Sequence, residues 1–408
     1  MTLHTMSTRP QFPPFRAEHL GSLLRPSRLL DKRHAIQQKR DTEDGLLDLE
    51  NQCIDEVVKI QLDCGFRAIS DGEYRRHMFW GTFFPSLNGF KEISGSEVTI
   101  DLFREYVPDL AAFLEEEKVP GESIICVGKI SHTGKSSYID QYEYLKKITP
   151  KERHGEIKLT LAAPNWYHLR YREGKAYPKE VYTSDEEYFA DIATAYRKEL
   201  EILYAAGVRN VQVDDPNLAY FCSEKMIEGW KKDAANTRSI DDLFDAYISF
   251  YNDCFQRPSD LHLGIHLCRG NFVNSRHFSE GSYDRIANKL FHNLDASTYY
   301  LEYDTSRAGG FEPLKSLPKH KNVILGVITS KFPELENKEE MQQRIYKAAE
   351  FVAAGSGQSR EDALKQLGVS PQCGFASHED GNLLSYQDMV KKLRLVRDIA
   401  DNIWPGEP

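Results

Sequence analysis

The sequence lacks the segments that would place it in a membrane or on a nucleic acid. No apolar run approaches the roughly 20 residues needed to span a bilayer. The opening residues contain no apolar core, so we expect no secretory signal. No clustered basic patch with interleaved aromatic residues is present, and the formal net charge is −10, which argues against a nucleic-acid partner. We therefore expect small molecules as partners, with no membrane and no nucleic acid.

The cysteine content is low and odd in number. Seven cysteines in 408 residues do not form a disulfide framework and suit a reducing compartment, so we expect a cytoplasmic protein. The composition, with 40% hydrophobic and 28% charged residues, is typical of a globular chain long enough for one large barrel or two domains. The sequence assigns no oligomeric state.

Helical patterns that end at a glycine and lead into a strand recur along the chain. Apolar residues at helical spacing run through 46–64 and stop before Gly65, and 66–71 reads as a strand. A second such helix ends at Gly207, before a strand over 208–213. Further strands are predicted at 124–129, 158–162, 261–267, 299–303 and 323–329.

This alternation predicts an α/β fold, and about eight strands in a chain of this length favour a (β/α)8 TIM barrel. We expect residues 1–15 to form a flexible N-terminal arm and residues 16–408 a single catalytic barrel. The aromatic-rich and less regular stretch at about 74–155 reads as an insertion. It either covers the barrel mouth, as a lid would, or packs on the outside as a helical excursion.

Four scattered residues suggest a metal site at the ends of the strands. His266 and Cys268 lie two apart in a strand-like segment, so their side chains point to the same face. Glu302 lies in a second strand-like segment, and Cys373 follows a third apolar stretch. One nitrogen, one oxygen and two sulfurs make a four-coordinate zinc set. The alternative is that the cysteines are buried core residues, as free cysteines usually are.

The chemistry of this donor set points to thiols. Two thiolates and a carboxylate carry three negative charges against the two positive charges of zinc, which makes the ion a poor activator of water. A metal-bound substrate thiol would still lose its proton and stay nucleophilic. Glu302 is the ligand most easily displaced by an incoming thiol. The pattern therefore predicts alkyl transfer to sulfur.

Several segments, in order from about residue 16 to residue 400, resemble the catalytic barrel of cobalamin-independent methionine synthase and its shorter relatives. The resemblance implies a (β/α)8 barrel with zinc held by His266, Cys268, Glu302 and Cys373. It also implies methylation of the homocysteine thiol with methyl-tetrahydrofolate as the donor. The matching segments are His19-Leu20-Gly21-Ser22, Ser70-Asp71-Gly72-Glu73, Leu159-Thr160-Leu161-Ala162-Ala163-Pro164, Gln212-Val213-Asp214-Asp215-Pro216, His266-Leu267-Cys268, Leu301-Glu302 and Pro371-Gln372-Cys373-Gly374.

The resemblance also implies a site for the amino acid part of homocysteine. Carried over by position, Glu73 and Asp214 would bind the ammonium group, and Ser22 would donate a hydrogen bond to the carboxylate. Each carboxylate has a structural alternative. Glu73 could form an ion pair with Arg75 or Arg76, and Asp214 could cap a helix that begins near the following proline.

Two departures from the family pattern bear on the methyl donor. The chain matches only the catalytic half of the full-length enzymes, which carry a second, N-terminal barrel. Lys331 stands where those enzymes place the histidine that protonates the folate leaving nitrogen, and lysine is a poor acid near neutral pH unless its pKa is lowered. Trp166 could stack on a flat donor or could be a core or rim residue.

Three hypotheses remain open beside a zinc-dependent homocysteine methyltransferase. One is a zinc-dependent thiol alkyltransferase or carbon–sulfur lyase that uses a non-folate electrophile, which the lysine at position 331 favours. Another is a metal-free barrel of the decarboxylase type, which a measurement of bound zinc would distinguish. The third is a non-catalytic zinc-binding or folate-binding relative, which would have no need of an exchangeable, electron-rich zinc.

Overall fold

A six-stranded parallel sheet forms the centre of the computed structural model, which describes residues 14–116, 118 and 120–408. The strands pair in chain order, each with the next, so the sheet grows from one edge to the other without a reversal. Its strands are β3 (Lys158–Ala162), β4 (Asn210–Asp214), β5 (His262–Leu267), β6 (Thr298–Glu302), β7 (Asn322–Ile328) and β8 (Leu367–Pro371). The predicted α/β class is confirmed.

Two extended segments continue the sheet at its edges. Ala17 pairs with Val369 of β8, and Ile69 pairs with Ile157 immediately before β3, both in parallel fashion. These segments hold the places of the first two strands of an eight-stranded barrel. Each is joined by a single-residue bridge, so the strand predicted at 66–71 is shorter than expected. Among the described residues no regular ladder connects the two segments to each other.

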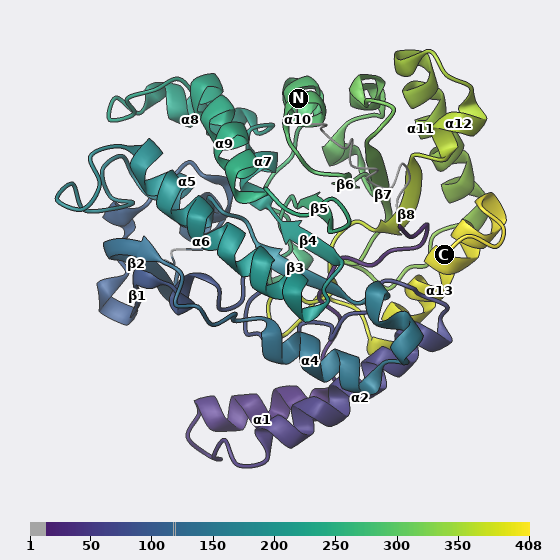
Figure 1. Ribbon diagram of the computed structural model, residues 1–408, viewed down its shortest axis with the longest axis horizontal. Coiled ribbons are helices and arrows are strands. Elements are labelled where there is room, and N and C mark those ends of the chain that lie inside the picture. The colour runs from purple at the N-terminus through teal and green to yellow at the C-terminus, as the bar shows by residue number, and fades with distance from the viewer. Residues whose placement is uncertain (1–13, 117, 119) are drawn as a thin grey trace, which may run out of the picture.

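Helices follow most strands and surround the sheet (Figure 1). The helix predicted before Gly207 is α6, which Ser184 caps by accepting from the Glu187 amide; Gly207 ends it with a φ of 112°. The helices are α1 (Ser27–Gln37), α2 (Leu46–Asp63), α3 (Pro108–Glu115), α4 (Ile139–Ile148), α5 (Trp166–Leu169), α6 (Asp185–Ala206), α7 (Pro216–Tyr220), α8 (Glu224–Lys232), α9 (Ile240–Cys254), α10 (Asp284–Asn293), α11 (Lys338–Ser356), α12 (Arg360–Leu364) and α13 (Tyr386–Ile403).

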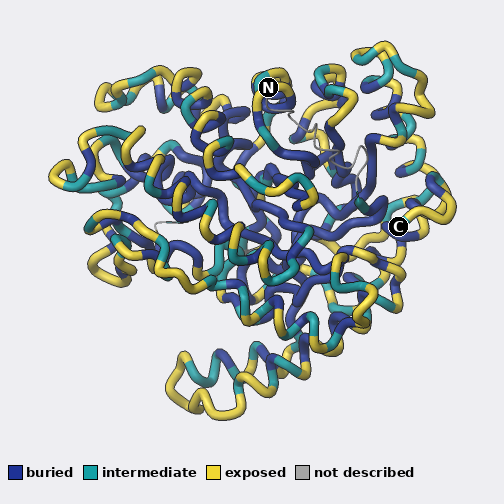
Figure 2. The backbone as a smooth tube through the Cα atoms, viewed as in Figure 1, coloured by how far each residue is buried: buried dark blue, intermediate teal, exposed yellow. Residues whose placement is uncertain are grey.

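The core lies on both faces of the central sheet. Every residue of β3 to β8 is buried, and Figure 2 shows this buried centre inside a more exposed helical layer. Parallel strands covered on both faces are rich in apolar residues without alternation, which explains their continuous apolar runs. In the described part of the chain, no helix has the length and apolar character needed to cross a membrane.

The segment 74–155 contains a separate two-stranded antiparallel sheet, formed by β1 (Asn88–Ser94) and β2 (Glu122–Ser131). It lies at the left of Figure 1, beside α5 and α6. The strand predicted at 124–129 is confirmed within β2, where it pairs with β1 and not with the central sheet. The lid role of this segment stays a prediction.

Residues 1–13 of the predicted N-terminal arm lie outside the described residues. Just after them, Arg16 packs against the other end of the chain. Its guanidinium forms an ion pair with Glu407, at 2.7 Å, and lies over the ring of Trp404. The single-domain assignment for 16–408 stays a prediction.

Candidate metal centre

The register of the sheet brings the predicted ligands to one edge. His266 on β5 pairs with Asp214 on β4, and Glu302 is the last residue of β6. Cys268 follows β5, and Cys373 follows β8. Because the carboxyl ends of parallel strands meet at the same edge, these side chains converge. One potential ligand atom from each of His266, Cys268, Glu302 and Cys373 lies within 4.8 Å of the others.

The donor atoms fit a four-coordinate zinc ion. The sulfurs of Cys268 and Cys373 are 3.4 Å apart, close to the separation of about 3.8 Å that two zinc–sulfur bonds of about 2.3 Å give in a tetrahedron. The ring of His266 is oriented by Asp214, whose Oδ1 lies 3.1 Å from Nδ1. Nε2 of the same ring therefore faces the cluster, 3.8 Å from Oε1 of Glu302.

The carboxylate of Glu302 is held from two sides. Its Oε1 accepts a hydrogen bond from the backbone amide of Arg269 at 2.8 Å, and its Oε2 pairs with the guanidinium of Arg307 at 2.9 Å. Burial opposes ionisation of this group, but Arg307 and His266 outweigh it and hold the pKa of Glu302 below its usual range. The carboxylate is thus ionised and available as an oxygen ligand.

The sulfurs of Cys268 and Cys373 form a hydrogen bond with each other. The hydrogen bond from Cys268 lowers the pKa of the Cys373 thiol against the effect of burial. The amide of Gly270 donates to the sulfur of Cys268 at 3.3 Å. The hydrogen bond with Cys373, together with burial, raises the pKa of the Cys268 thiol, so Cys373 is the sulfur of the two that is held as a thiolate.

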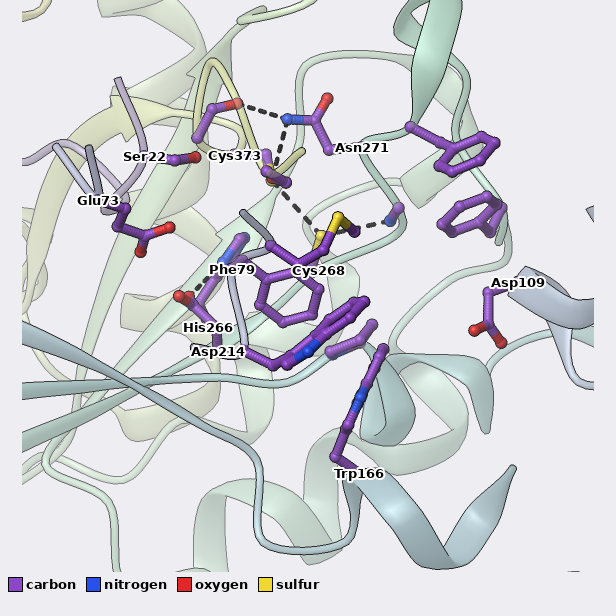
Figure 3. Close-up of a pocket in the computed structure, with 18 of the residues that line it drawn as sticks. Ser22, Glu73, Phe79, Asp109, Trp166, Asp214, His266, Cys268, Asn271 and Cys373 are labelled. Atoms are coloured by element: carbon purple, nitrogen blue, oxygen red, sulfur yellow. Dashed lines mark hydrogen bonds and ion pairs between the residues drawn. The ribbon is translucent and has the colours of Figure 1, made fainter. Parts of the chain in front are cut away.

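The cluster forms one wall of a cavity of about 400 Å³ (Figure 3). Ser22, Glu73 and Asp214 line it near the cluster, and the remaining wall is largely aromatic. Three of the four predicted metal ligands, His266, Cys268 and Cys373, line this cavity together with the three predicted substrate contacts, and Glu302 lies behind them in the cluster. The aromatic side chains that line the cavity are Phe79, Trp80, Phe113, Trp166, Tyr220, Phe272 and Phe278.

Glu73 presents one unpaired oxygen. Its Oε1 accepts from Thr160 Oγ1 at 2.6 Å and lies 3.4 Å from the Arg76 guanidinium, whereas Oε2 has no hydrogen-bond partner among the described residues. Burial raises the pKa of Glu73 to about 7, although Arg76 lowers it. The predicted structural alternative, an ion pair with Arg76, is present. It occupies Oε1 and leaves Oε2 for another partner.

Two glycines permit the close packing around Glu73 and Ser22. A Cβ atom at Gly21, where φ is 81°, would lie 2.6 Å from Oε1 of Glu73. A Cβ atom at Gly374 would lie 2.0 Å from Oγ of Ser22. Only glycine allows these backbone segments to approach the two side chains so closely.

Asp214 acts through His266 and does not cap a helix. Its Oδ1 accepts from Gln212 Nε2 at 2.7 Å and contacts the His266 ring. The cap of α7 is the neighbouring Asp215, which accepts from the amide of Leu218 at 2.9 Å. The carboxylate of Asp214 therefore both orients a predicted ligand and faces the cavity.

Trp166 and Lys331 lie in different settings. The ring of Trp166 stacks on Trp80, with centroids 5.3 Å apart, and has the Arg170 guanidinium 4.7 Å from its centroid, so it belongs to the cavity wall. Lys331 is buried and does not line the cavity. Its ammonium donates to Gly270 O at 2.9 Å and to two further oxygens, which fixes the loop after Cys268.

Sequence patterns missed the arginines that hold this site. Arg307 follows Glu302 by five residues and lies in a short 3-10 helix, and nothing in its spacing indicated a contact with the carboxylate. Arg170 forms a buried ion pair with Asp109 at 2.8 Å, across more than sixty residues of chain. Such pairings depend on tertiary structure, so no local signal could have revealed them.

Comparisons with known proteins identify the relatives. Residues 178–402 match the family described as "Cobalamin-independent synthase, Catalytic domain". The chain is 35% identical over 393 residues to the uncharacterized protein YxjH of Bacillus subtilis, covering 96% of this chain and 95% of that protein. It is 24% identical over 345 residues to a 5-methyltetrahydropteroyltriglutamate–homocysteine methyltransferase of Listeria innocua. That match covers 83% of this chain but only 37% of the Listeria protein.

Solved structures share the fold. A Listeria monocytogenes protein, provisionally named a vitamin-B12-independent methionine synthase, superposes with a TM-score of 0.69 at 26% identity. The match covers 96% of this chain and 99% of that one. A B12-independent methionine synthase from Shewanella sp. W3-18-1, solved with selenomethionine, gives a TM-score of 0.64 at 19% identity. It covers 96% of this chain and 98% of that chain, and supports the fold alone.

Proposed function

This chain belongs to the family of cobalamin-independent synthase catalytic domains, an enzyme family of methyltransferases, and we propose that it transfers a methyl group to the thiol of homocysteine in a zinc-dependent reaction. The observation that supports this most directly is the convergence of His266, Cys268, Glu302 and Cys373 in one cluster, three of whose members line a cavity. An electron-rich donor set of this kind suits thiol chemistry better than hydrolysis.

Zinc, held by these four residues, would lower the pKa of a substrate thiol and keep it as a nucleophilic thiolate. Glu302 is the ligand we expect to yield its place, because its second oxygen already pairs with Arg307. The carboxylate released in this way would stay in an ion pair and would not be left as an isolated buried charge.

The amino acid end of the substrate would bind beside the cluster. The unpaired Oε2 of Glu73 and the carboxylate of Asp214 would accept hydrogen bonds from the ammonium group. Ser22 Oγ would donate to the substrate carboxylate. These contacts would fix the sulfur near the cluster and leave the aromatic part of the cavity for the methyl donor.

The transfer itself is a displacement at carbon. A carbon–sulfur bond forms as the bond between the methyl carbon and the donor atom breaks, and the electron pair of that bond stays on the donor. The thiol proton is released when the thiolate forms, and one proton is taken up by the leaving atom. The donor leaves in its demethylated, protonated form, so atoms and charges balance.

A second candidate is a zinc-dependent thiol alkyltransferase or carbon–sulfur lyase that uses a non-folate electrophile. The placement of Lys331 favours it, because the ammonium is fixed to loop oxygens outside the cavity and does not point at a leaving group. A folate donor needs a proton at its leaving nitrogen, so it would depend on another acid or on water.

The deciding experiment combines a metal measurement with a donor screen. We expect about one zinc per chain, and methylation of homocysteine with methyl-tetrahydrofolate or with another methyl donor. Far less than one zinc per chain would favour the metal-free decarboxylase hypothesis. Zinc-loaded protein that alkylates the thiol only with a non-folate electrophile would favour the second candidate. The seven cysteines, all free in the structure, accord with the cytoplasmic location that we also propose.

A further inference from the structure

The strand β7 supplies none of the four clustered ligands, although it lies in the sheet between β6, which ends at Glu302, and β8, which leads to Cys373. Two polar residues follow β7 at this same edge, and both are buried: Ser330 is 0% exposed and Lys331 is 2% exposed. A buried ammonium is costly unless its charge and its donors find partners. The contacts of these two residues therefore indicate what the end of β7 contributes to the site.

The ammonium of Lys331 binds the loop that follows Cys268. It donates to Gly270 O at 2.9 Å, to Asn271 Oδ1 at 3.1 Å and to Arg276 O at 3.1 Å. An ammonium has three N–H donors, so all three are used within this one loop. The amide of Gly270 in turn donates to the sulfur of Cys268 at 3.3 Å. Lys331 therefore holds the piece of backbone that contacts the first of the two sulfurs.

The same segment also binds the loop that follows Cys373. Ser330 Oγ donates to Gly374 O at 2.8 Å. The side-chain amide of Asn271 donates to the same carbonyl at 2.6 Å (Figure 3). Because the oxygen of that amide accepts from Lys331, a bridge runs from Lys331 through Asn271 to Gly374. This bridge connects the two loops that carry the cysteines.

The loop after Cys268 has a backbone conformation that needs support. Asn274 and Ser275 have φ values of 61° and 59°, in the left-handed region that residues other than glycine rarely adopt. Such conformations persist where the surrounding structure imposes them. Lys331 contacts the loop on both sides of its chain, since its ammonium binds Arg276 O and its own carbonyl accepts from Ser275 Oγ at 2.7 Å. The shape of this loop therefore depends on Lys331.

The two sulfurs need loops that are already held together. The sulfurs of Cys268 and Cys373 are 3.4 Å apart, although the residues lie 105 positions apart in the chain. Two thiolates at this distance repel each other, so a metal ion gathers them most readily when the loops that carry them are fixed beforehand. The positive charge of Lys331 also interacts favourably with the charged forms of Glu302 and of both cysteines.

We infer that Lys331 is a positioning residue for the metal centre, and that its bridge through Asn271 presets the spacing of the Cys268 and Cys373 sulfurs. The ammonium acts through the loop and does not line the cavity, so it touches neither the thiol nor the methyl donor. Because all three of its N–H donors are used inside the loop, we assign it no proton transfer to a leaving group. The inference rests on the proposed function in one respect, that the cluster holds zinc.

Metal binding by the full-length protein tests the inference without any measurement of turnover. In Lys331→Met the loop loses its anchor, so we expect the zinc affinity, measured by competition with a chelator, to fall about tenfold to a hundredfold. Substitution with Co²⁺ gives a second measurement, because the absorption of tetrahedral Co²⁺ depends on the geometry of its sulfur ligands. We expect the ligand-field bands to shift in Lys331→Met. A wild-type cobalt spectrum, or a wild-type zinc affinity, in the folded variant would overturn the inference.

A second variant cuts the bridge at its middle and keeps the ammonium. Asn271→Leu removes the donor to Gly374 O, so it should lower the zinc affinity and shift the cobalt bands in the same direction as Lys331→Met. It also serves if Lys331→Met fails to fold. If both residues act through one bridge, the double variant should lose less zinc affinity than the product of the two single losses. Fully multiplicative losses would overturn the bridge.

Lys321 supplies a matched control at the opposite end of the same strand. It immediately precedes β7 and is 6% exposed, and its ammonium also donates to backbone oxygens, among them Leu294 O at 3.0 Å. Lys321→Met should leave the zinc affinity within about twofold of wild type and the cobalt spectrum unchanged. Equal changes in Lys321→Met and Lys331→Met would overturn the positioning role, since they would reflect the loss of any buried ammonium.

The outcomes also separate this inference from the proposed function. If Lys331→Met weakens zinc binding but the wild type methylates homocysteine with no donor, the positioning role stands and the proposed function fails. If the wild type methylates homocysteine while Lys331→Met binds zinc as tightly as the wild type does, the proposed function stands and the positioning role fails.

Discussion

Arg307 pairs with one carboxylate oxygen of Glu302 at 2.9 Å, while the other oxygen of that carboxylate faces the cluster of potential metal ligands. Arg307 also pairs with Asp304 at 2.8 Å, so the guanidinium is fixed from two directions. An oxygen ligand whose charge is shared with a guanidinium donates less electron density to a metal. We therefore propose that Glu302 is the exchangeable member of the set.

Arg307→Met tests this role. Loss of the guanidinium should leave the Glu302 carboxylate without its charged partner on Oε2, and we expect kcat/KM for homocysteine to fall about tenfold to a hundredfold. Steady-state kinetics with varied thiol, together with zinc competition against a chelator, would measure both effects. Arg285→Met, which removes a surface pair with Asp241, is the control and should stay within about twofold of wild type. Wild-type kinetics in Arg307→Met would refute the role.

Cys268→Ser should abolish metal binding without unfolding the protein. A serine hydroxyl stays protonated where a thiolate would bind zinc, so we expect less than about a tenth of the wild-type zinc and no detectable methyl transfer. Elemental analysis measures the zinc, and circular dichroism checks the fold. Cys64→Ser is the control: Cys64 lies at the end of α2, outside the cluster, so this variant should bind as much zinc as the wild type. Full zinc occupancy in Cys268→Ser would remove this residue from the ligand set.

The sequence predicted the proximity of the four candidate ligands better than it predicted the sheet. His266 is near the end of β5, Cys268 follows that strand directly, and Glu302 ends β6, so their positions at strand ends were enough to predict that they lie together. The segment around Ile69 forms a single bridge, although its residues resemble a strand. Whether a segment pairs as a strand depends on which other segment lies beside it in the folded chain, and the local sequence does not specify that neighbour.

Sequence patterns did not predict the side chains that contact the site from distant parts of the chain. Arg170 pairs with Asp109, which lies 61 residues earlier in the chain, and the ammonium of Lys331 donates to the backbone oxygen of Gly270 in a different loop. The strand predicted near Ile124 shows the same limit from the other side. Its composition predicted an extended segment correctly, but not that its partner would be β1 in a separate antiparallel sheet.

Glu73→Gln should weaken binding of the substrate amino group. The variant keeps the size of the side chain but removes the charge that faces the ammonium, so we expect the homocysteine KM at pH 8 to rise about tenfold to a hundredfold, with zinc retained. Glu50, which pairs with Arg33 at 2.6 Å away from the cavity, supplies the control. Glu50→Gln should leave KM unchanged, and a wild-type KM in Glu73→Gln would contradict the assignment.

The pH dependence of KM gives a second reading of the same residue. Burial raises the pKa of Glu73 to about 7, so the group is ionised above that pH and protonated below it. In the wild type the homocysteine KM should therefore rise as pH falls below about 7, by up to about tenfold for each pH unit. In Glu73→Gln this dependence should be lost. An unchanged pH profile in the variant would assign the titration to another group.

Two buried histidines should make the protein sensitive to acid. Burial lowers the pKa of His19 to about 3 and that of His262 to about 3. His262 is enclosed between Asn210 and Thr298, at 2.9 and 2.8 Å. In the unfolded chain a histidine titrates near pH 6.5. Between about pH 6.5 and pH 3 the unfolded state therefore binds more protons than the folded state, and stability falls as the pH falls.

At pH 5 each histidine should reduce the free energy of unfolding by about 2 kcal/mol relative to pH 7. His262→Gln can keep hydrogen bonds to both neighbours but cannot gain the proton. Between pH 7 and pH 5 the free energy of unfolding of His262→Gln should therefore fall by about 2 kcal/mol less than that of the wild type, whatever the stability of the variant at pH 7. Urea unfolding at a series of pH values measures the slope. His292 is exposed in the folded state, so His292→Gln should reproduce the wild-type slope, and a wild-type slope in His262→Gln would show that its imidazole is protonated in the folded protein.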